Sequence, residues 1–254
     1  MCRLLGVVAD RARTPRELLG AELDPFRSMS KVHCDGWGCA FWNESDQLRL
    51  TKAPEPALGS RTFDELCDTA RTDATLLHLR KASPGMSNLA ENTHPFLAGG
   101  VAFAHNGWAW PNDELDGLLT DAGGDAPVGS TDSERYFRLV LALAREGDVL
   151  QALDEATSQI AERTEFLSLN CLLLTHDALY AVEYWDPPRV AAKGDDPDTF
   201  ALRYRVDTHA VVVASSGWEQ QSPEWTALTN RRVLEVRRGD LRTRVHQLRA
   251  TAAA

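Results

Sequence analysis

The second residue of the chain carries the most chemistry. The sequence begins Met1-Cys2-Arg3, so removal of Met1 would leave Cys2 with a free amino terminus. That residue would hold a thiol with a pKa of about 8.5 and an α-amine with a pKa of roughly 7.7–8.0. Because both groups exchange protons near neutral pH, such a cysteine brings its own base to the attack on an amide carbonyl. The position alone also fits a cysteine without a chemical role, since some residue must come second.

A pair of hydrogen-bond donors follows the apolar segment 100–105. His105 ends this segment and is followed by Asn106 and Gly107. A side-chain amide next to a glycine N–H can donate two hydrogen bonds to one oxygen, as an oxyanion hole does. The Asn-Gly dipeptide is equally typical of a tight hairpin turn. Taken alone, these residues leave both interpretations open.

Two charged residues would suit the ends of an amino acid. Arg80 ends the apolar segment 75–80, and a guanidinium there can bind a carboxylate through two parallel hydrogen bonds. Asp132 lies in the sequence STDSE, which is typical of a helix start. Its carboxylate is suited either to capping that helix or to receiving an ammonium group. A solvated arginine and a helix cap are the alternatives to a joint amino-acid site.

Composition narrows the class of protein. The 254 residues include 27 Lys and Arg against 37 Asp and Glu, a net charge of −10, which argues against nucleic acid and membrane surfaces as partners. The five cysteines are odd in number and irregular in spacing, and neither a secretory signal nor a long apolar span is present. We therefore expect a cytoplasmic protein with reduced thiols. Cys34, Cys39 and His33 lack the second cluster that a tetrahedral metal site needs, so no metal is expected.

Hydrophobic patterning predicts strands, then two central helices, then more strands. Short turns between neighbouring strands favour antiparallel pairing, and two sheets with helices on their outer faces would bury both. Glycines inside segment 36–42 mark a strand that another backbone or a ligand approaches closely. Strands are predicted at 4–9, 36–42, 48–52, 75–80, 100–105, 200–206, 210–215 and 233–236, a hairpin at 168–185, and helices at 15–20, 61–71, 132–163 (a pair divided near Gly147) and 241–254.

Six short segments carry a family resemblance. MCRLLG, DGWGCAFW, HLRKAS, NTHPF, FAHNGW and STDSE occur in this order within residues 1–138, and VVVASSGW and VLEVRRGDL follow. In these segments the chain resembles the class II glutamine amidotransferases, which are N-terminal-nucleophile (Ntn) hydrolases. More narrowly, it resembles their small stand-alone branch, which includes the ergothioneine-pathway γ-glutamyl amidohydrolase. The resemblance implies an α+β fold, a four-layer αββα sandwich of two mainly antiparallel sheets, as one glutamine amidotransferase type 2 domain over residues 1–254.

The resemblance also implies a role for each matching residue. Cys2 would be the nucleophile, with its own α-amine as base once Met1 is removed, and Asn106 and Gly107 would form the oxyanion hole. No metal or organic cofactor is implied. The glutamyl part of the substrate would be bound by Arg80 (α-carboxylate), Ser83 (near that carboxylate), His105 and Asp132 (α-ammonium).

The implied reaction is cleavage of the γ-glutamyl amide bond of glutamine or of a γ-glutamylated small molecule, with release of glutamate and ammonia or an amine. Amidotransferases of this family normally carry a synthetase domain that uses the ammonia. A glutaminase subunit that supplies a separate synthetase is therefore the alternative. An inactive glutamate-binding or scaffold homologue is the alternative of another class, and the presence of the nucleophile with both donors argues against it. The sequence leaves a homo-oligomer open.

Three tryptophans bear on the leaving amine. The irregular segments 81–97, 108–131 and 186–200 would shape that side of the site. Trp108 and Trp110 lie within them, and Trp218 follows Ser215-Ser216-Gly217. Such rings can stack on a flat amine, while packing beneath a loop is their alternative role.

Overall fold

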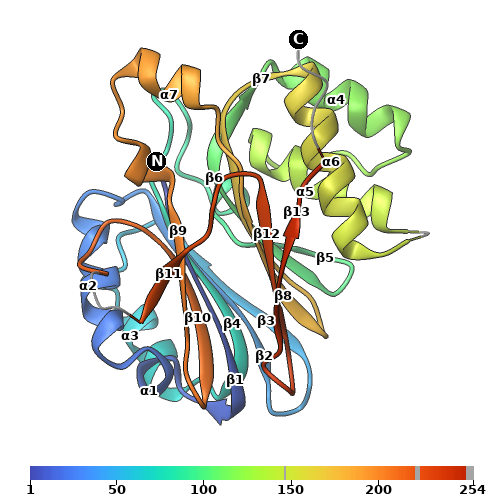
Figure 1. Ribbon diagram of the computed structural model, residues 1–254. Helices are drawn as coiled ribbons and strands as arrows, with labels where there is room; N and C mark the ends of the chain where they lie inside the picture. Colours follow the sequence, from blue (N-terminus) through green and yellow to red (C-terminus); the bar gives the residue numbers. More distant parts are fainter. Residues whose placement is uncertain (146, 221–223, 250–254) are drawn as a thin grey trace.

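Two antiparallel β-sheets form the centre of the computed structural model, which describes residues 1–145, 147–220 and 224–249 (Figure 1). In the described residues the first sheet has seven strands in the order β11-β9-β10-β1-β4-β2-β3. These strands are β1 (Arg3–Arg13), β2 (Gly36–Asn43), β3 (Leu48–Ala53), β4 (Thr72–Arg80), β9 (Leu202–Val206), β10 (Ala210–Ser215) and β11 (Trp225–Ala227). The second sheet has six strands in the order β13-β12-β8-β7-β6-β5. These are β5 (Phe96–Ala98), β6 (Val101–Trp110), β7 (Glu165–Leu174), β8 (Ala178–Glu183), β12 (Arg232–Arg237) and β13 (Thr243–Gln247).

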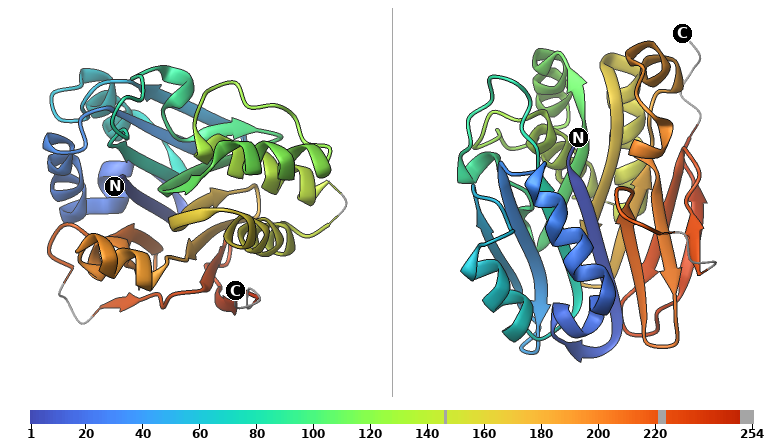
Figure 2. Two further views of the ribbon diagram at one scale, coloured as in Figure 1. Left: turned by 90° about the horizontal axis from the view of Figure 1, so that it is seen from above. Right: turned by 90° about the vertical axis from the view of Figure 1, so that its left-hand side faces the viewer.

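Helices cover the outer faces of both sheets and complete four layers, αββα (Figures 1 and 2). One set packs on the first sheet: α1 (Pro15–Leu19), α2 (Leu23–Ser28) and α3 (Arg61–Thr69). Another packs on the second sheet: α4 (Asn112–Asp121), α5 (Asp132–Ala144) and α6 (Val149–Arg163). A short helix, α7 (Pro187–Lys193), lies near the amino terminus at one end of the sandwich (Figure 1). The predicted four-layer α+β sandwich of antiparallel sheets is confirmed.

The alternation of side chains along β1 explains how this strand lies between two cores. Leu4 and Val8 point into the apolar layer between the sheets, whereas Leu5 and Val7 point toward the helices. This period of two is the geometry of an extended strand buried on both faces. Gly6 allows the sheets to approach, since a Cβ at this position would lie 2.7 Å from the Leu179 side chain. Cys2 therefore precedes a strand that is fixed on both sides.

Three expectations about local structure differ from the structure. The tail helix predicted at 241–254 is wrong, because residues 243–247 form β13 and pair with β12; residues 250–254 lie outside the described residues. The expected irregular segments 108–131 and 186–200 contain helices α4 and α7. β13 is fixed by backbone pairing with β12, whereas α4 and α7 form where they bury apolar side chains, namely Leu115, Leu118 and Leu119 in α4 and Val190 in α7. Local sequence does not reveal these partners. Within the described residues, no helix has both the length and the apolar character that crossing a membrane requires.

Candidate active site

The Cys2 thiol lies against the backbone of Lys81. Pairing of Arg3 with Leu79 brings the start of β1 beside the end of β4. The Lys81 N–H donates to Cys2 Sγ at 3.4 Å, and the thiol donates to the Lys81 carbonyl oxygen at 3.6 Å. Burial raises the pKa of the Cys2 thiol, and the Lys81 N–H opposes this rise. With Met1 attached, the thiol is therefore held in its neutral form near pH 7.

A small cavity of about 40 Å³ adjoins Cys2 and gathers most of the predicted site residues. It lies at the end of the sandwich where β1, β4 and β6 meet the start of α5. Six of the seven predicted residues line it: Cys2, Arg80, Ser83, His105, Gly107 and Asp132. Asn106, the seventh, lies next to Gly107 on β6 and is fully buried.

The pair Asn106 and Gly107 lies inside β6, so the hairpin-turn alternative is wrong. Both residues pair with β7, Asn106 with Asn170 and Gly107 with Leu169. The side-chain nitrogen and oxygen of Asn106 are buried and have no hydrogen-bond partner among the described residues. An unpaired buried amide costs about 1–3 kcal/mol, and both side-chain atoms of Asn106 remain available to a hydrogen-bonding partner.

Only glycine fits at position 107. A Cβ on Gly107 would lie 1.7 Å from the carbonyl oxygen of Ser168 and 2.7 Å from Nε2 of His105. The register between β6 and β7 shifts just beyond this point, between Trp108 and Ala109. The close approach of the two strands therefore fixes the backbone of residue 107 at the cavity wall.

Arg80 is buried, and its guanidinium is partly occupied by the protein. Nη1 donates to Asn88 Oδ1 at 2.8 Å and to the Asp35 carbonyl at 3.4 Å, and Nη2 donates to the Ser87 carbonyl at 3.3 Å. A guanidinium has five N–H donors. Within the described part of the chain, the Nε–H and one Nη2 hydrogen remain for a ligand. Such a pair suits a carboxylate.

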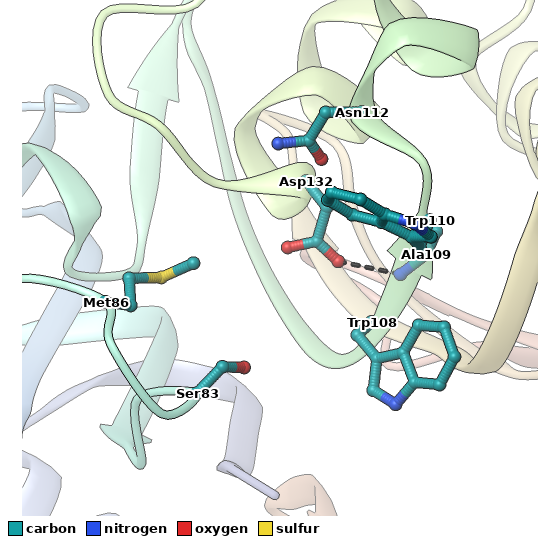
Figure 3. A pocket seen from close by; sticks show the side chains of 7 residues that line it. All are labelled: Ser83, Met86, Trp108, Ala109, Trp110, Asn112 and Asp132. Carbon is teal, nitrogen blue, oxygen red and sulfur yellow. Dashed lines mark hydrogen bonds between the residues drawn. The ribbon is translucent and has the colours of Figure 1, made fainter.

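Asp132 is the first residue of α5 but not its cap. Thr131 is the N-cap, and its hydroxyl accepts from the Glu134 N–H at 3.1 Å. The Asp132 Oδ2 instead accepts from the Ala109 N–H at 2.8 Å, which fixes the carboxylate relative to β6. Figure 3 shows the other oxygen pointing into the space between Asp132 and Ser83. That oxygen, Oδ1, also lies 3.5 Å from the Ser133 hydroxyl, a long contact that leaves it able to receive a cation.

His105 lines the cavity, but both of its ring nitrogens are used within the protein. Nε2 lies 3.0 Å from the Ser168 carbonyl, and Nδ1 lies 2.9 Å from Ser133 Oγ. Burial lowers the pKa of His105, and the nearby negative charge of Asp132 offsets only part of this change, so the ring is neutral near pH 7. Since a carbonyl only accepts, the proton sits on Nε2 and Nδ1 accepts from the Ser133 hydroxyl. The ring thereby connects β6 to β7 and to α5.

Sequence reasoning assigned no role to two residues that fix the segment after Arg80. Asp35 Oδ2 accepts from the Ala82 N–H at 2.8 Å, and its Oδ1 accepts from Asn88 Nδ2 at 3.1 Å. Asn88 in turn accepts from Arg80, so the three side chains form one network. Asp35 directly precedes the glycine-rich strand β2, which is a weak signal in the sequence. Nothing local marks Asn88.

The expected close approach at the glycine-rich strand β2 is confirmed. A Cβ on Gly38 would lie 2.2 Å from the His94 carbonyl oxygen. The His94 ring in turn lies 3.0 Å from the His78 ring, measured from Nδ1 to Nε2. Burial holds the pKa of both histidines well below the usual range, so the pair is neutral near pH 7. Segment 92–96 is therefore packed directly on β2 beside the cavity.

A larger pocket of about 390 Å³ adjoins the cavity and shares Ser83, Met86 and Asp132 with it. Figure 3 shows Ser83 and Met86 on one side and the aromatic rings of Trp108 and Trp110 on the other. Trp218 lies elsewhere: it packs edge-on against Phe26, and its Nε1 donates to Glu22. The three tryptophans are thus divided between the site and the helix layer.

Among the described residues, no group of three or more His, Cys, Asp or Glu side chains is arranged to hold a metal ion. All five cysteines are free thiols.

Comparison with known proteins identifies the family. Residues 1–253 match the sequence profile described as "Glutamine amidotransferases class-II". The chain belongs to the class II glutamine amidotransferases. Its fold is shared with two solved structures. One is a glutamine amidotransferase class-II domain protein of Silicibacter pomeroyi (TM-score 0.70, 20% identity, 98% of this chain and 100% of that one). The other is the Bacillus subtilis glutamine phosphoribosylpyrophosphate amidotransferase (TM-score 0.69, 17% identity, 98% of this chain and 49% of that one).

Two curated relatives are similar over much of the sequence. An uncharacterized protein of Methanocaldococcus jannaschii is 30% identical over 193 residues, which cover 71% of this chain and 50% of that protein. The chain thus spans about half the length of that relative. A γ-glutamyl-hercynylcysteine sulfoxide hydrolase of Mycolicibacterium smegmatis is 24% identical over 235 residues, which cover 88% of this chain and 92% of that protein.

Proposed function

We propose that the protein is an N-terminal cysteine amidohydrolase that cleaves the γ-glutamyl amide bond of a γ-glutamylated small molecule or of glutamine. The observation that carries this proposal is the buried, unpaired amide of Asn106, next to Gly107 at the wall of the Cys2 cavity. The Asn106 Nδ2–H is free to donate to a ligand oxygen, and a tetrahedral intermediate of amide cleavage supplies one. The name of the M. smegmatis relative is consistent with this reaction.

The first half of the reaction forms a thioester. Once Met1 is removed, the α-amine of Cys2 takes the thiol proton, and Sγ attacks the γ-carbonyl carbon of the substrate. A carbon–sulfur bond forms, and the carbonyl electron pair moves to oxygen, where the Asn106 amide and the Gly107 N–H stabilise the negative charge. When the carbonyl re-forms, the carbon–nitrogen bond breaks. The α-ammonium returns its proton to the departing nitrogen, which leaves as ammonia or a neutral amine.

The second half releases glutamate. The same α-amine removes a proton from water, which attacks the thioester carbon. Collapse of this second tetrahedral intermediate breaks the carbon–sulfur bond, and the proton passes from the α-ammonium to the sulfur. The enzyme returns to its starting state, and the chain's own groups account for every proton.

Binding of the glutamyl part is assigned to groups around the cavity. Arg80 has two free N–H donors for the α-carboxylate, with the Ser83 hydroxyl nearby. Asp132 offers one carboxylate oxygen to the α-ammonium, while Ala109 fixes the other. Since both ring nitrogens of His105 are occupied, we assign it a positioning role at Gly107 in place of the expected substrate contact.

Intact mass and labelling test this function together. We expect the purified chain to lack Met1 and a γ-glutamyl diazoketone to add one mass increment, mapped to the peptide that begins at Cys2. The Cys2→Ala variant should release no glutamate yet still bind glutamate. A label on Cys34, the exposed cysteine, would contradict the nucleophile assignment, as would full retention of Met1 in active protein.

Ammonia supply to a separate synthetase remains the second candidate. The B. subtilis amidotransferase, of which the match covers only 49%, shows this fold as part of a longer chain. Glutamate release from glutamine, measured with and without extract from the producing cells, distinguishes the two. A large increase with extract would favour the subunit.

A further inference from the structure

The side chain of Met1 packs into an apolar cluster next to Cys2. The cluster consists of buried Leu167, Val190 and Phe200, and Trp108 and Trp185 pack against it together with Met1. The rings of Trp185 and Phe200 are stacked, with centroids 6.2 Å apart and planes inclined by 24°. Removal of Met1 takes one apolar side chain out of this cluster. The processed enzyme then has an apolar, aromatic-walled space beside its new amino terminus.

The chemistry of the proposed function places the leaving amine on this side of Cys2. The departing nitrogen receives its proton from the α-amine of Cys2, so it must lie next to that nitrogen atom. The same nitrogen atom is the one to which Met1 is attached. The glutamyl part lies on the other side, in the cavity that Arg80, Gly107 and Asp132 line. A substituent on the leaving nitrogen therefore extends toward the place of the Met1 side chain.

We propose that the space vacated by Met1 is the leaving-group subsite and that it takes an apolar or aromatic substituent on the amine. This inference rests on the proposed function and selects one class of substrate within it: γ-glutamyl amides of amines that carry a ring or a hydrocarbon chain. The side chains of the cluster are hydrocarbon and aromatic, so burying an apolar or ring-bearing substituent against them is favourable. Ammonia, the leaving group of glutamine, would leave the space unfilled.

The cluster also distinguishes this subsite from the larger neighbouring pocket. Trp108 belongs to both regions, whereas Trp110 lines only the 390 Å³ pocket and Trp185 packs only against the Met1 cluster. One face of Trp108 is further engaged by the Lys193 ammonium, 4.8 Å from the ring centroid. Trp185, whose Nε1 also donates to Glu183 Oε1 at 3.3 Å, is therefore the probe of the Met1 cluster, and Trp110 is the probe of the rival pocket.

The test compares γ-glutamylbenzylamide with γ-glutamylmethylamide, using full-length protein whose loss of Met1 is verified by mass. Both leaving groups are aliphatic amines, so the two substrates differ mainly in the ring. We expect kcat/KM to be at least tenfold higher for the benzylamide. In Trp185→Ala this ratio should fall at least fivefold, and Trp185→Phe, which keeps an aromatic wall, should restore most of it. In Trp110→Ala and in Trp218→Ala the ratio should stay within twofold of that of the unaltered protein.

Each outcome bears on the proposal. A ratio near one in the unaltered protein would overturn it, as would a fall in Trp110→Ala with none in Trp185→Ala, which would place the ring in the larger pocket. If Trp185→Ala is poorly folded, the Trp185→Phe variant and the ratio in the unaltered protein still decide. Absence of Cys2-dependent glutamate release from both amides and from glutamine would instead refute the proposed function. Equal cleavage of all three would refute the subsite alone.

Discussion

Asn106 and Asn170 lie directly opposite each other on β6 and β7, and only one of the two amides is satisfied. Asn170 Oδ1 accepts from the Tyr184 N–H at 2.7 Å, and its Nδ2 donates to the Phe200 carbonyl. The Asn106 amide has no partner among the described residues. Asn170 thus has a structural role, whereas Asn106, at the paired position on the same face of the sheet, has the proposed catalytic one.

Alanine at each of these positions should therefore have opposite consequences. Asn106→Ala removes an oxyanion donor, and we expect kcat to fall about 10²- to 10³-fold. It also removes an unsatisfied buried amide, so thermal stability should be retained or increased. Asn170→Ala leaves the Tyr184 N–H and the Phe200 carbonyl unpaired and should cost roughly 2–4 kcal/mol of unfolding free energy. Kinetics on a γ-glutamyl amide and denaturant titration measure the two effects; a large loss of stability in Asn106→Ala would contradict the assignment.

Gly107→Ala should damage both activity and stability. The new Cβ would overlap the Ser168 carbonyl, so β6 and β7 must separate at the cavity wall and the 107 N–H must move. We expect a loss of at least 100-fold in kcat/KM together with a lower melting temperature. Gly147→Ala is the matched control, because no atom lies within 4 Å of its Cβ, and it should behave as the unaltered chain does. Normal activity in Gly107→Ala would show that the backbone there is not part of the site.

Asp132→Asn tests the proposed ammonium contact without disturbing α5. The asparagine oxygen still accepts from the Ala109 N–H, and the Thr131 cap is untouched. Loss of the charge should raise KM for γ-glutamyl amides roughly 10- to 100-fold, with a much smaller change in kcat and in melting temperature. Asp148→Asn, which replaces the N-cap of α6 with another good cap, is the control. An unchanged KM in Asp132→Asn would remove Asp132 from the substrate site.

Glu183 should make the stability of the protein depend on pH. The carboxyl is buried beneath Trp185 and Leu202, and burial raises its pKa from 4.5 to about 7. Between these values the folded chain binds more protons at this site than the unfolded chain, so stability falls as the pH rises. The contribution is complete below pH 4.5 and lost above about pH 7, a difference of roughly 3 kcal/mol.

Glu183→Gln should abolish most of that slope, because the amide is neutral throughout. Melting temperatures measured from pH 4.5 to 8 compare it with the unaltered chain and with Glu165→Gln, an exposed position that should keep the slope. Parallel curves for Glu183→Gln and the unaltered chain would show that this carboxyl titrates normally.

The predictability of the site differs from residue to residue. The short motifs around Cys2, Asn106 and Asp132 identify candidate reacting groups, and their residue types already restrict the reactions that these groups can perform. They could not show that Asn106 and Gly107 lie inside a strand, because Asn-Gly favours a turn until a neighbouring strand pairs with it. Nor could they show that the His105 ring is occupied, since Ser133 and Ser168 reach it from α5 and β7. One domain over residues 1–254 and a cytoplasmic location stay predictions.

By itself, the sequence determined the layers of the sandwich, most of its strands and the candidate reacting groups, because side-chain periodicity and residue type act locally. Only the tertiary structure decided which polar atoms of the described residues are left unpaired, which donors of Arg80 have no partner among those residues, and that Met1 packs against an apolar cluster next to Cys2. These properties depend on contacts between residues far apart in the chain, such as residues 81, 107 and 200 around the start of β1. The partners of a buried polar group follow from the packed neighbours, and no segment of sequence carries that information alone.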